Sequence, residues 1–266
     1  MASFSVVTNI AASNATANLE ATNIGLNKSI TRLSSGLRIN SSGDDAAGLA
    51  VANQFRSTEA VLTQGVQNAN DGLSTLQIKD GALNNISTLL DRLSTLATES
   101  ASSASTANRT VLNNEFQDVL SEIDREANVA GLTTSGGFSV FVSSNGTNGV
   151  IAGTIGAANV STLGLTGQKV DTATNAATAV ASIATAISNL GSTQGSVGQI
   201  ENRLSYSISL SQTQIVNDQA AESRLRDANV AQESANLTKY QILTQSGLSA
   251  LAQANSSSAA VLKLLG

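Results

Sequence analysis

One heptad position is apolar without interruption from about residue 44 to residue 100. Its members recur every seven residues: Phe55, Leu62, Ala69, Leu76, Leu83, Leu90 and Ala97. A second apolar series runs through Val66 and Leu73 and then, after a change of phase, through Ile86 and Leu93. Two apolar positions sustained over many turns are typical of a coiled coil. The pattern predicts one helix of roughly 80 Å at 1.5 Å per residue.

The segment ASSAST at 101–106 interrupts this pattern, and a second helical segment is predicted at about 107–130. Asn108 or Thr106 can cap it. Its apolar stripe consists of Val111, Leu112, Phe116, Val119, Leu120 and Ile123.

The hydrophobic period then changes, because FSVFV at 138–142 alternates as a strand does. Asn145-Gly146 is a dipeptide favoured in two-residue hairpin turns, since both positions tolerate positive φ. Val150, Ile151 and Ile155 can form the return strand. We therefore expect a small β-hairpin at about 137–160.

A third helix is predicted from residues 171–174, any of which can be its N-cap. Its heptad positions are Val180, Ile183, Ile187, Leu190, Gln194, Val197, Glu201, Leu204, Ile208, Ser211 and Ile215. The polar members Gln194, Glu201 and Ser211 either fix register and partner choice or lie at the edge of the apolar seam.

Both ends of the chain are weakly amphipathic. The first seam is Leu19, Leu26, Ile30, Leu33 and Leu37, and the last segment carries Leu237, Tyr240, Leu243, Leu248, Leu251, Val261, Leu262, Leu264 and Leu265. Isolated helices of this kind are marginal in water, so each end needs the other end or another molecule as its partner. If the chain folds back at its middle, both halves pair. The predicted fold is mainly α: a long antiparallel helical bundle or coiled coil with a small β-hairpin.

The amino-acid composition argues against several classes of function. The 266 residues include no His, Cys, Pro or Trp, which removes the commonest metal ligands, the usual general base and the thiol nucleophile. We therefore expect no enzyme and no cofactor. A net charge of −5 argues against nucleic acid as a partner. No apolar run is long enough for a membrane span, and the N-terminus lacks a signal peptide, which by itself predicts a cytoplasmic protein.

The stretch RLSSGLRINSSGDDAAGLA at 32–50 interrupts helix on both sides. We interpret it as a joint in which the first helix ends around Arg38, Gly36 and Gly43 permit the crossing, and Asp44 caps the next helix with Asp45 in its first turn. The alternative is a cation site that uses both carboxylates, although no further oxygen ligands are evident at the required offsets.

Three glycines, Gly65, Gly72 and Gly81, lie inside the predicted long helix, where each costs about 1 kcal/mol relative to alanine. Either the long helix tolerates them, or they let the backbone of a neighbouring subunit approach closely.

Several segments resemble bacterial flagellins. RLSSGLRINSSGDDAAGLAVANQF (32–55) and NANDGLSTLQIKDGAL (68–83) are similar to the N-terminal signature of that family. ESRLRDANVAQESANLTKYQIL (222–243) and SALAQANSSSAAVLKLLG (249–266) are similar to the C-terminal signature. The resemblance implies a subunit of the flagellar filament with two domains: D0, residues 1–43 and 227–266, and D1, residues 44–226.

The resemblance also implies partners and a location. It predicts a homopolymer, export in unfolded form through the flagellar type III apparatus, an export chaperone on the C-terminal helix, and contacts with filament cap and hook-junction proteins. The expected location is thus the extracellular filament, which replaces the cytoplasmic prediction. We expect subunit packing at Leu19, Leu26, Leu33, Gly65, Gly72, Gly81, Leu251, Leu262 and Leu265.

One departure concerns DRLSTLA at 91–97, which resembles the segment that an innate immune receptor recognises in some flagellins. Arg92 and Leu96 match that pattern, but Thr95 replaces its Glu. The alternatives to a filament subunit are a hook–filament junction protein of the same family and a soluble coiled-coil adhesion or signalling module.

Overall fold

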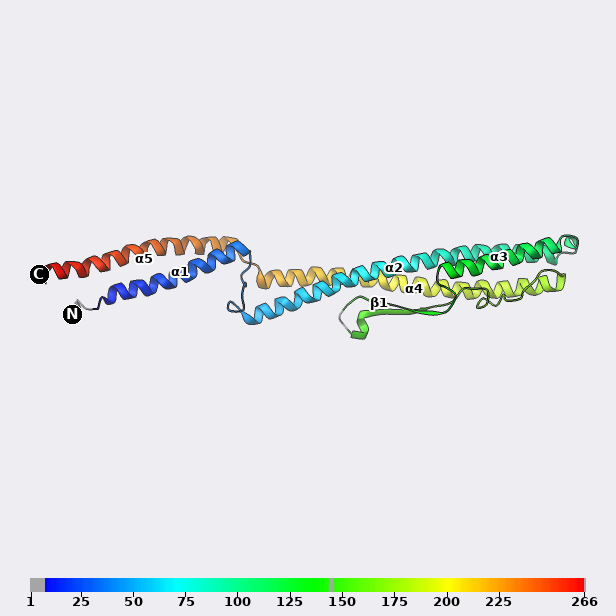
Figure 1. The fold of residues 1–266 in the computed structure, drawn as a ribbon, viewed down its shortest axis with the longest axis horizontal. Helices are drawn as coiled ribbons and strands as arrows, with labels where there is room; N and C mark the ends of the chain where they lie inside the picture. Colours follow the sequence, from blue (N-terminus) through cyan, green and yellow to red (C-terminus); the bar gives the residue numbers. More distant parts are fainter. Residues whose placement is uncertain (1–7, 144–145, 266) are drawn as a thin grey trace. The chain divides into compact units, whose positions relative to one another are not determined.

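The structure is a computed structural model that describes residues 8–143 and 146–265. Within these ranges it contains five α-helices and two strands (Figure 1). They are α1 (Ile10–Ser35), α2 (Ala46–Ala101), α3 (Arg109–Val129), β1 (Gly136–Phe141), β2 (Val150–Ile155), α4 (Ala173–Arg226) and α5 (Val230–Leu265). The mainly-α prediction with a small hairpin is confirmed. The chain divides into two compact units, one of residues 58–217 and one of residues up to 57 together with those from 218.

The core of the 58–217 unit forms around the predicted heptad of α2. Leu76, Leu83 and Leu90 are completely buried, as the seven-residue spacing predicts. The shorter helix α3 adds the ring of Phe116 and the side chain of Ile123, both also fully buried. Burying one such side chain contributes about 1.5–3 kcal/mol, so this seam stabilises the unit more than any polar contact does.

Of the two heptad series predicted for α4, one is buried and the other is not. Ile183, Leu190, Val197 and Leu204 are buried as expected. The second buried series lies one residue earlier than predicted, at Ala179, Ala186, Thr193 and Ile200. Three of these four side chains are small, whereas Ile187 of the predicted series points outward and is 39% exposed. Gln194 and Glu201 therefore lie at the seam edge, while Ser211 is buried.

The hairpin pairs β1 with β2 in antiparallel register, with Val140 opposite Ile151. The predicted two-residue turn is wrong. The strands are joined through a short 3-10 helix, η2 (Gly146–Gly149), and Gly146 has a φ of 57°. Asn145 lies outside the described residues. The hairpin occupies 136–155 rather than 137–160, since the last paired residues are Gly136 and Ile155.

Residues 156–172 return to α4 without regular structure, yet Leu163, Leu165 and Val170 are buried. Helix α3 holds this segment by its side chains. Asn113 Oδ1 accepts the Val170 N–H at 3.0 Å, and Asp124 Oδ1 accepts the Val160 N–H at 2.8 Å. Asn108 occupies the N-cap position of α3, but its side chain makes no capping hydrogen bond.

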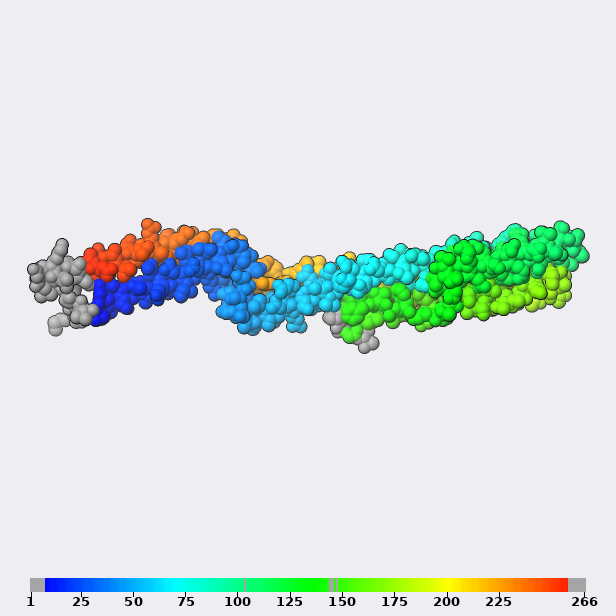
Figure 2. All heavy atoms as spheres, in the orientation of Figure 1, coloured from blue at the N-terminus to red at the C-terminus, as the bar shows by residue number. Residues whose placement is uncertain are grey.

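The other unit is built on the two ends of the chain. Helices α1 and α5 run antiparallel and lie side by side, so each end has the other as its partner (Figures 1 and 2). Helix α1 ends at Ser35, three residues before the predicted Arg38, because Gly36 adopts a left-handed conformation (φ 72°) and closes the helix with its N–H on Arg32 O.

Candidate functional site

The candidate site is the predicted joint, residues 36–45, together with the paired terminal helices that hold it. Its first part is bonded to the last residue of α4 and to the segment between α4 and α5. Arg38 N–H donates to Arg226 O at 2.6 Å, and Ala228 N–H donates to Gly36 O at 2.8 Å. Leu37 and Asp227 form an isolated antiparallel bridge. The segment is therefore fixed by backbone hydrogen bonds and is not a free loop.

Asp45, not Asp44, caps α2. The helix begins at Ala46, and Asp45 Oδ1 accepts the N–H of Gly48 at 2.9 Å. This corrects the prediction by one residue, because only the residue directly before the helix can reach its free N–H groups. Gly43 lies in the turn that precedes this cap, which the Asp44 N–H closes on Ser41 O at 3.0 Å.

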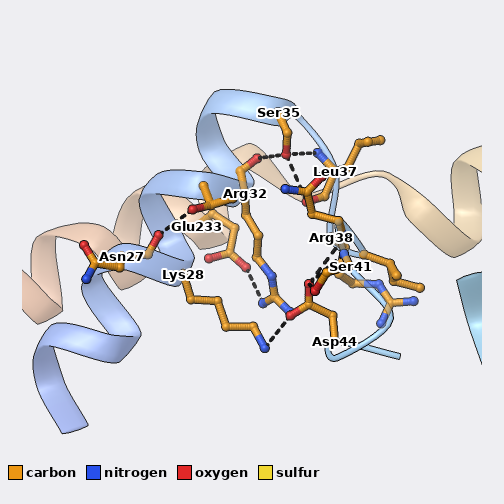
Figure 3. A network of polar contacts seen from close by, with 12 residues as sticks. Asn27, Lys28, Arg32, Ser35, Leu37, Arg38, Ser41, Asp44 and Glu233 are labelled. Carbon is orange, nitrogen blue, oxygen red and sulfur yellow. Dashed lines mark hydrogen bonds and ion pairs between the residues drawn. The ribbon is translucent and has the colours of Figure 1, made fainter. Parts of the chain in front are cut away.

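Asp44 instead forms an ion pair with α1 (Figure 3). Its Oδ1 lies 2.7 Å from Lys28 Nζ, and its Oδ2 accepts the N–H groups of Asn40 and Ser41, each at 3.3 Å. The hydrogen bond from Lys28, aided by those two N–H groups, lowers the pKa of Asp44 to about 2. The carboxylate is thus ionised at any physiological pH.

Arg32 connects this pair to α5. Its guanidinium is 4.0 Å from Asp44 Oδ1 and donates to Glu233 Oε1 at 3.1 Å. Glu233 is only 7% exposed. Both predicted cation-site carboxylates therefore have protein partners, Asp44 in this network and Asp45 in the helix cap. Within residues 8–143 and 146–265, no group of three His, Cys, Asp or Glu side chains could hold a metal ion.

The glycines of α2 differ in what they face. A Cβ on Gly65 would overlap the carbonyl oxygen of Val142, and a Cβ on Gly72 would lie 2.7 Å from Val140 Cγ2. Both glycines are buried beneath the chain's own hairpin, so the prediction that they face a neighbouring subunit is wrong. Gly81 is exposed, with no atom within 4 Å of an added Cβ, and its role in subunit packing stays a prediction.

Arg92 and Leu96, the two residues that match the receptor-recognised pattern, differ in burial. Leu96 is 1% exposed and belongs to the hydrophobic core of the 58–217 unit. Arg92 is on the surface and forms an ion pair with Glu115 of α3. The patch predicted from Arg92 and Leu96 therefore cannot present both side chains.

The predicted packing leucines Leu19, Leu26, Leu33 and Leu251 are half-buried between α1 and α5. Leu262 and Leu265 lie in α5, but their side chains are outside the described part of the chain. The same helices leave other large apolar side chains uncovered: Ile10, Ile24, Val230, Ile242 and Leu248 are 54–70% exposed. No helix of the described residues is both long and apolar enough to cross a membrane.

Sequence reasoning missed Lys28, Arg32 and Glu233. Lys28 and Arg32 are four residues apart, which places both cations on one face of α1, and this signal was available. Glu233, the partner of Arg32, could not be assigned, because it lies 201 residues further along the chain than Arg32.

Fold and site together define a helical protein whose two chain ends pair and leave apolar faces uncovered. The bacterial flagellin N-terminal helical region matches residues 6–145, and the bacterial flagellin C-terminal helical region matches residues 180–265. The chain belongs to the bacterial flagellin family.

Individual relatives align over most of both chains. A flagellin of Halalkalibacterium halodurans is 34% identical, over 91% of this chain and 94% of its own. The flagellar filament 33 kDa core protein of Treponema phagedenis is 34% identical, over 92% and 93%. Among solved structures, the crystal structure of Bacillus cereus flagellin matches with a TM-score of 0.46 and 24% identity, covering 54% of this chain and 88% of that chain.

Proposed function

We propose that this chain is a structural subunit that polymerises with itself into the flagellar filament and serves swimming motility. The observation that carries the proposal is the antiparallel pairing of α1 with α5, which leaves Ile24 and Ile242 70% and 63% exposed. A surface of this kind favours a partner. A head-to-tail contact that does not close on itself generates a helical filament.

Family membership supports the same proposal and adds the route to the cell exterior. We propose export in unfolded form by the flagellar type III apparatus, with a chaperone on the C-terminal helix before export and contacts with cap and hook-junction proteins afterwards. The absence of Cys and Pro removes disulfides and slow proline isomerisation from refolding. The proposed location is the extracellular filament, and the proposed role is structural, not enzymatic.

We further propose that residues 1–43 and 227–266 form D0 and residues 44–226 form D1, with 36–45 as the joint. Gly43 is the third residue of the turn at 41–44, where proline is disfavoured. Gly43→Pro is therefore expected to impair filament form or assembly more than expression of the subunit. Gly43→Ala is the matched control, and normal swimming and filament shape with Gly43→Pro would contradict the joint.

The terminal helices are proposed to order only when the subunit enters the filament, because α1 and α5 bury little apolar surface on each other. Hydrogen exchange would check this by comparing depolymerised subunits with filaments. Fast exchange at 1–40 and 228–266 in the free subunit is expected, with protection in the polymer. Strong protection of both segments in the free subunit would refute this part of the proposal.

Seeded polymerisation of the purified chain tests the function itself. The expected result, seen by electron microscopy, is long filaments that grow from fragments of filament. A hook–filament junction protein would add at most a short segment, and a soluble coiled-coil module would remain a discrete oligomer. Either of those outcomes would replace the proposed function.

A further inference from the structure

The pairing of α1 with α5 has almost no apolar core. In the parts of these helices whose side chains are described, residues 10–35 and 230–257, only Ser29 and Glu233 are buried, at 3% and 7% exposure. The leucines of the seam are only half-buried. Hydrophobic burial therefore specifies poorly which turn of α1 lies beside which turn of α5.

Specific contacts nevertheless place the two helices in one register. The Tyr240 ring lies against Gly25, where a Cβ would be 2.5 Å from the ring carbon Cζ. Further along, a Cβ on Gly247 would be 3.0 Å from Leu19 Cδ1, and the Asn9 side chain donates to Ala254 O at 3.0 Å. These matches are steric or weakly polar.

The charged contact of the same register is the one formed by Lys28, Asp44, Arg32 and Glu233. It involves three elements: α1 provides the two cations, α5 provides Glu233, and the segment before α2 provides Asp44 (Figure 3). Arg32 contacts both carboxylates, and its Nε is buried without a hydrogen-bond partner among the described residues. The guanidinium thus depends on these two anions.

We propose that this network is a register clasp: Glu233 fixes the register of α5 on α1 through Arg32, and Asp44 fastens the segment 36–45 to the same register. The proposal deepens the proposed filament function and rests on it, since it states how the terminal pair is aligned within each subunit.

The physical reason is the cost of a mismatch. A shift of α5 by one heptad would bring Tyr240 or Arg226 to the place of Glu233 and leave the Arg32 guanidinium without its anion. Such an uncompensated partly buried charge is strongly unfavourable, whereas the intact pair adds little net stability. A polar group in a weak helical seam is the best-attested device for fixing register.

The absence of cysteine makes disulfide trapping a clean test. Leu19→Cys with Gly247→Cys reports the observed register, and Leu26→Cys with Gly247→Cys reports a shift of one heptad. Each pair is made alone, with Glu233→Gln, and with Glu20→Gln, which removes a carboxylate from an exposed position of α1. The variants are co-assembled as a minority with unmodified chain, so that an intrachain disulfide runs as monomer on a non-reducing gel.

With Glu233→Gln, the yield of the in-register disulfide is expected to fall about threefold or more relative to the shifted one. With Glu20→Gln, the ratio is expected to stay unchanged. Equal ratios in all three backgrounds would overturn the clasp. If the unmodified chain forms no filaments, the filament function fails. If it forms filaments and the ratios are equal in all three backgrounds, only the clasp fails.

Asp44→Asn separates the second half of the proposal from the first. In filaments, the in-register yield is expected to remain high, while the amides of Asn40 and Ser41 exchange hydrogen faster than in filaments of the unmodified chain. Unchanged exchange at both amides would show that Asp44 does not fasten the segment.

Discussion

The approach of the hairpin to α2 allows a sharp test, because three glycines of one helix face three different surroundings. A Cβ on Gly65 would overlap the Val142 carbonyl oxygen and lie 2.9 Å from Val142 Cα, so the backbone of the hairpin must move. A Cβ on Gly72 meets the flexible Val140 side chain at 2.7 Å. On Gly81 it meets nothing within 4 Å.

The magnitudes follow from two opposing terms. Alanine in place of glycine inside a helix gains about 1 kcal/mol, and overpacking costs typically 1–3 kcal/mol, at the upper end where backbone must shift. Gly81→Ala should therefore stabilise the chain by about 1 kcal/mol and Gly65→Ala destabilise it by about 2 kcal/mol. For a unit of this size those values correspond to shifts in Tm of about +2 to +4 °C and −4 to −8 °C. Gly72→Ala should fall between them.

Thermal unfolding of the soluble chain, followed by circular dichroism, measures these shifts, with Gly81→Ala as the control for the intrinsic helix term. Hydrogen exchange in β1 and β2 should accelerate with Gly65→Ala and not with Gly81→Ala. A Tm for Gly65→Ala at or above that of the unmodified chain would refute the packing of the hairpin on α2.

Three further predictions concern ionisable groups. Asp45→Ala should lower the free energy of unfolding by about 1 kcal/mol through loss of the α2 cap, as measured by urea titration. Burial, with Asp80 nearby, raises the pKa of Glu201, so its charge opposes folding increasingly as pH rises above the ordinary value of 4.5. Glu201→Gln should raise Tm at pH 7 and leave it unchanged at pH 4, and no gain at pH 7 would contradict this. The lowered pKa of Asp44 implies the opposite sign in the filament, where α1 is ordered: its contribution of about 1–2 kcal/mol should be complete above about pH 4 and be lost as pH falls toward 2. Asp44→Asn should abolish that part of the acid dependence of filament stability, measured by acid depolymerisation.

The sequence predicted α2 and its buried face because leucines seven residues apart leave one interpretation. It misplaced half of the α4 seam because Ala179 and Ala186 neighbour the more hydrophobic Val180 and Ile187. Hydrophobicity ranks the larger residues first, but close helix packing selects the small ones. Periodicity cannot resolve two series that differ by a single position.

The site was predictable in its place but not in its contacts. The Ser/Gly run identified a break at 36–45, and the adjacent aspartates identified a helix start. Asp45 caps α2 because the helix begins at Ala46, and a start one residue earlier would have made Asp44 the cap. Asp44 is instead held by Lys28 of α1. The burial of Gly65 likewise depends on a hairpin that follows more than 70 residues later, which no local pattern reports.

Electron microscopy of cells that lack this chain tests the central claim most directly. If the chain is the filament subunit, cells without it should have lost filaments or carry filaments of altered length or form, and expression of the unmodified chain should restore them. Filaments of normal number, length and shape on those cells would contradict the claim.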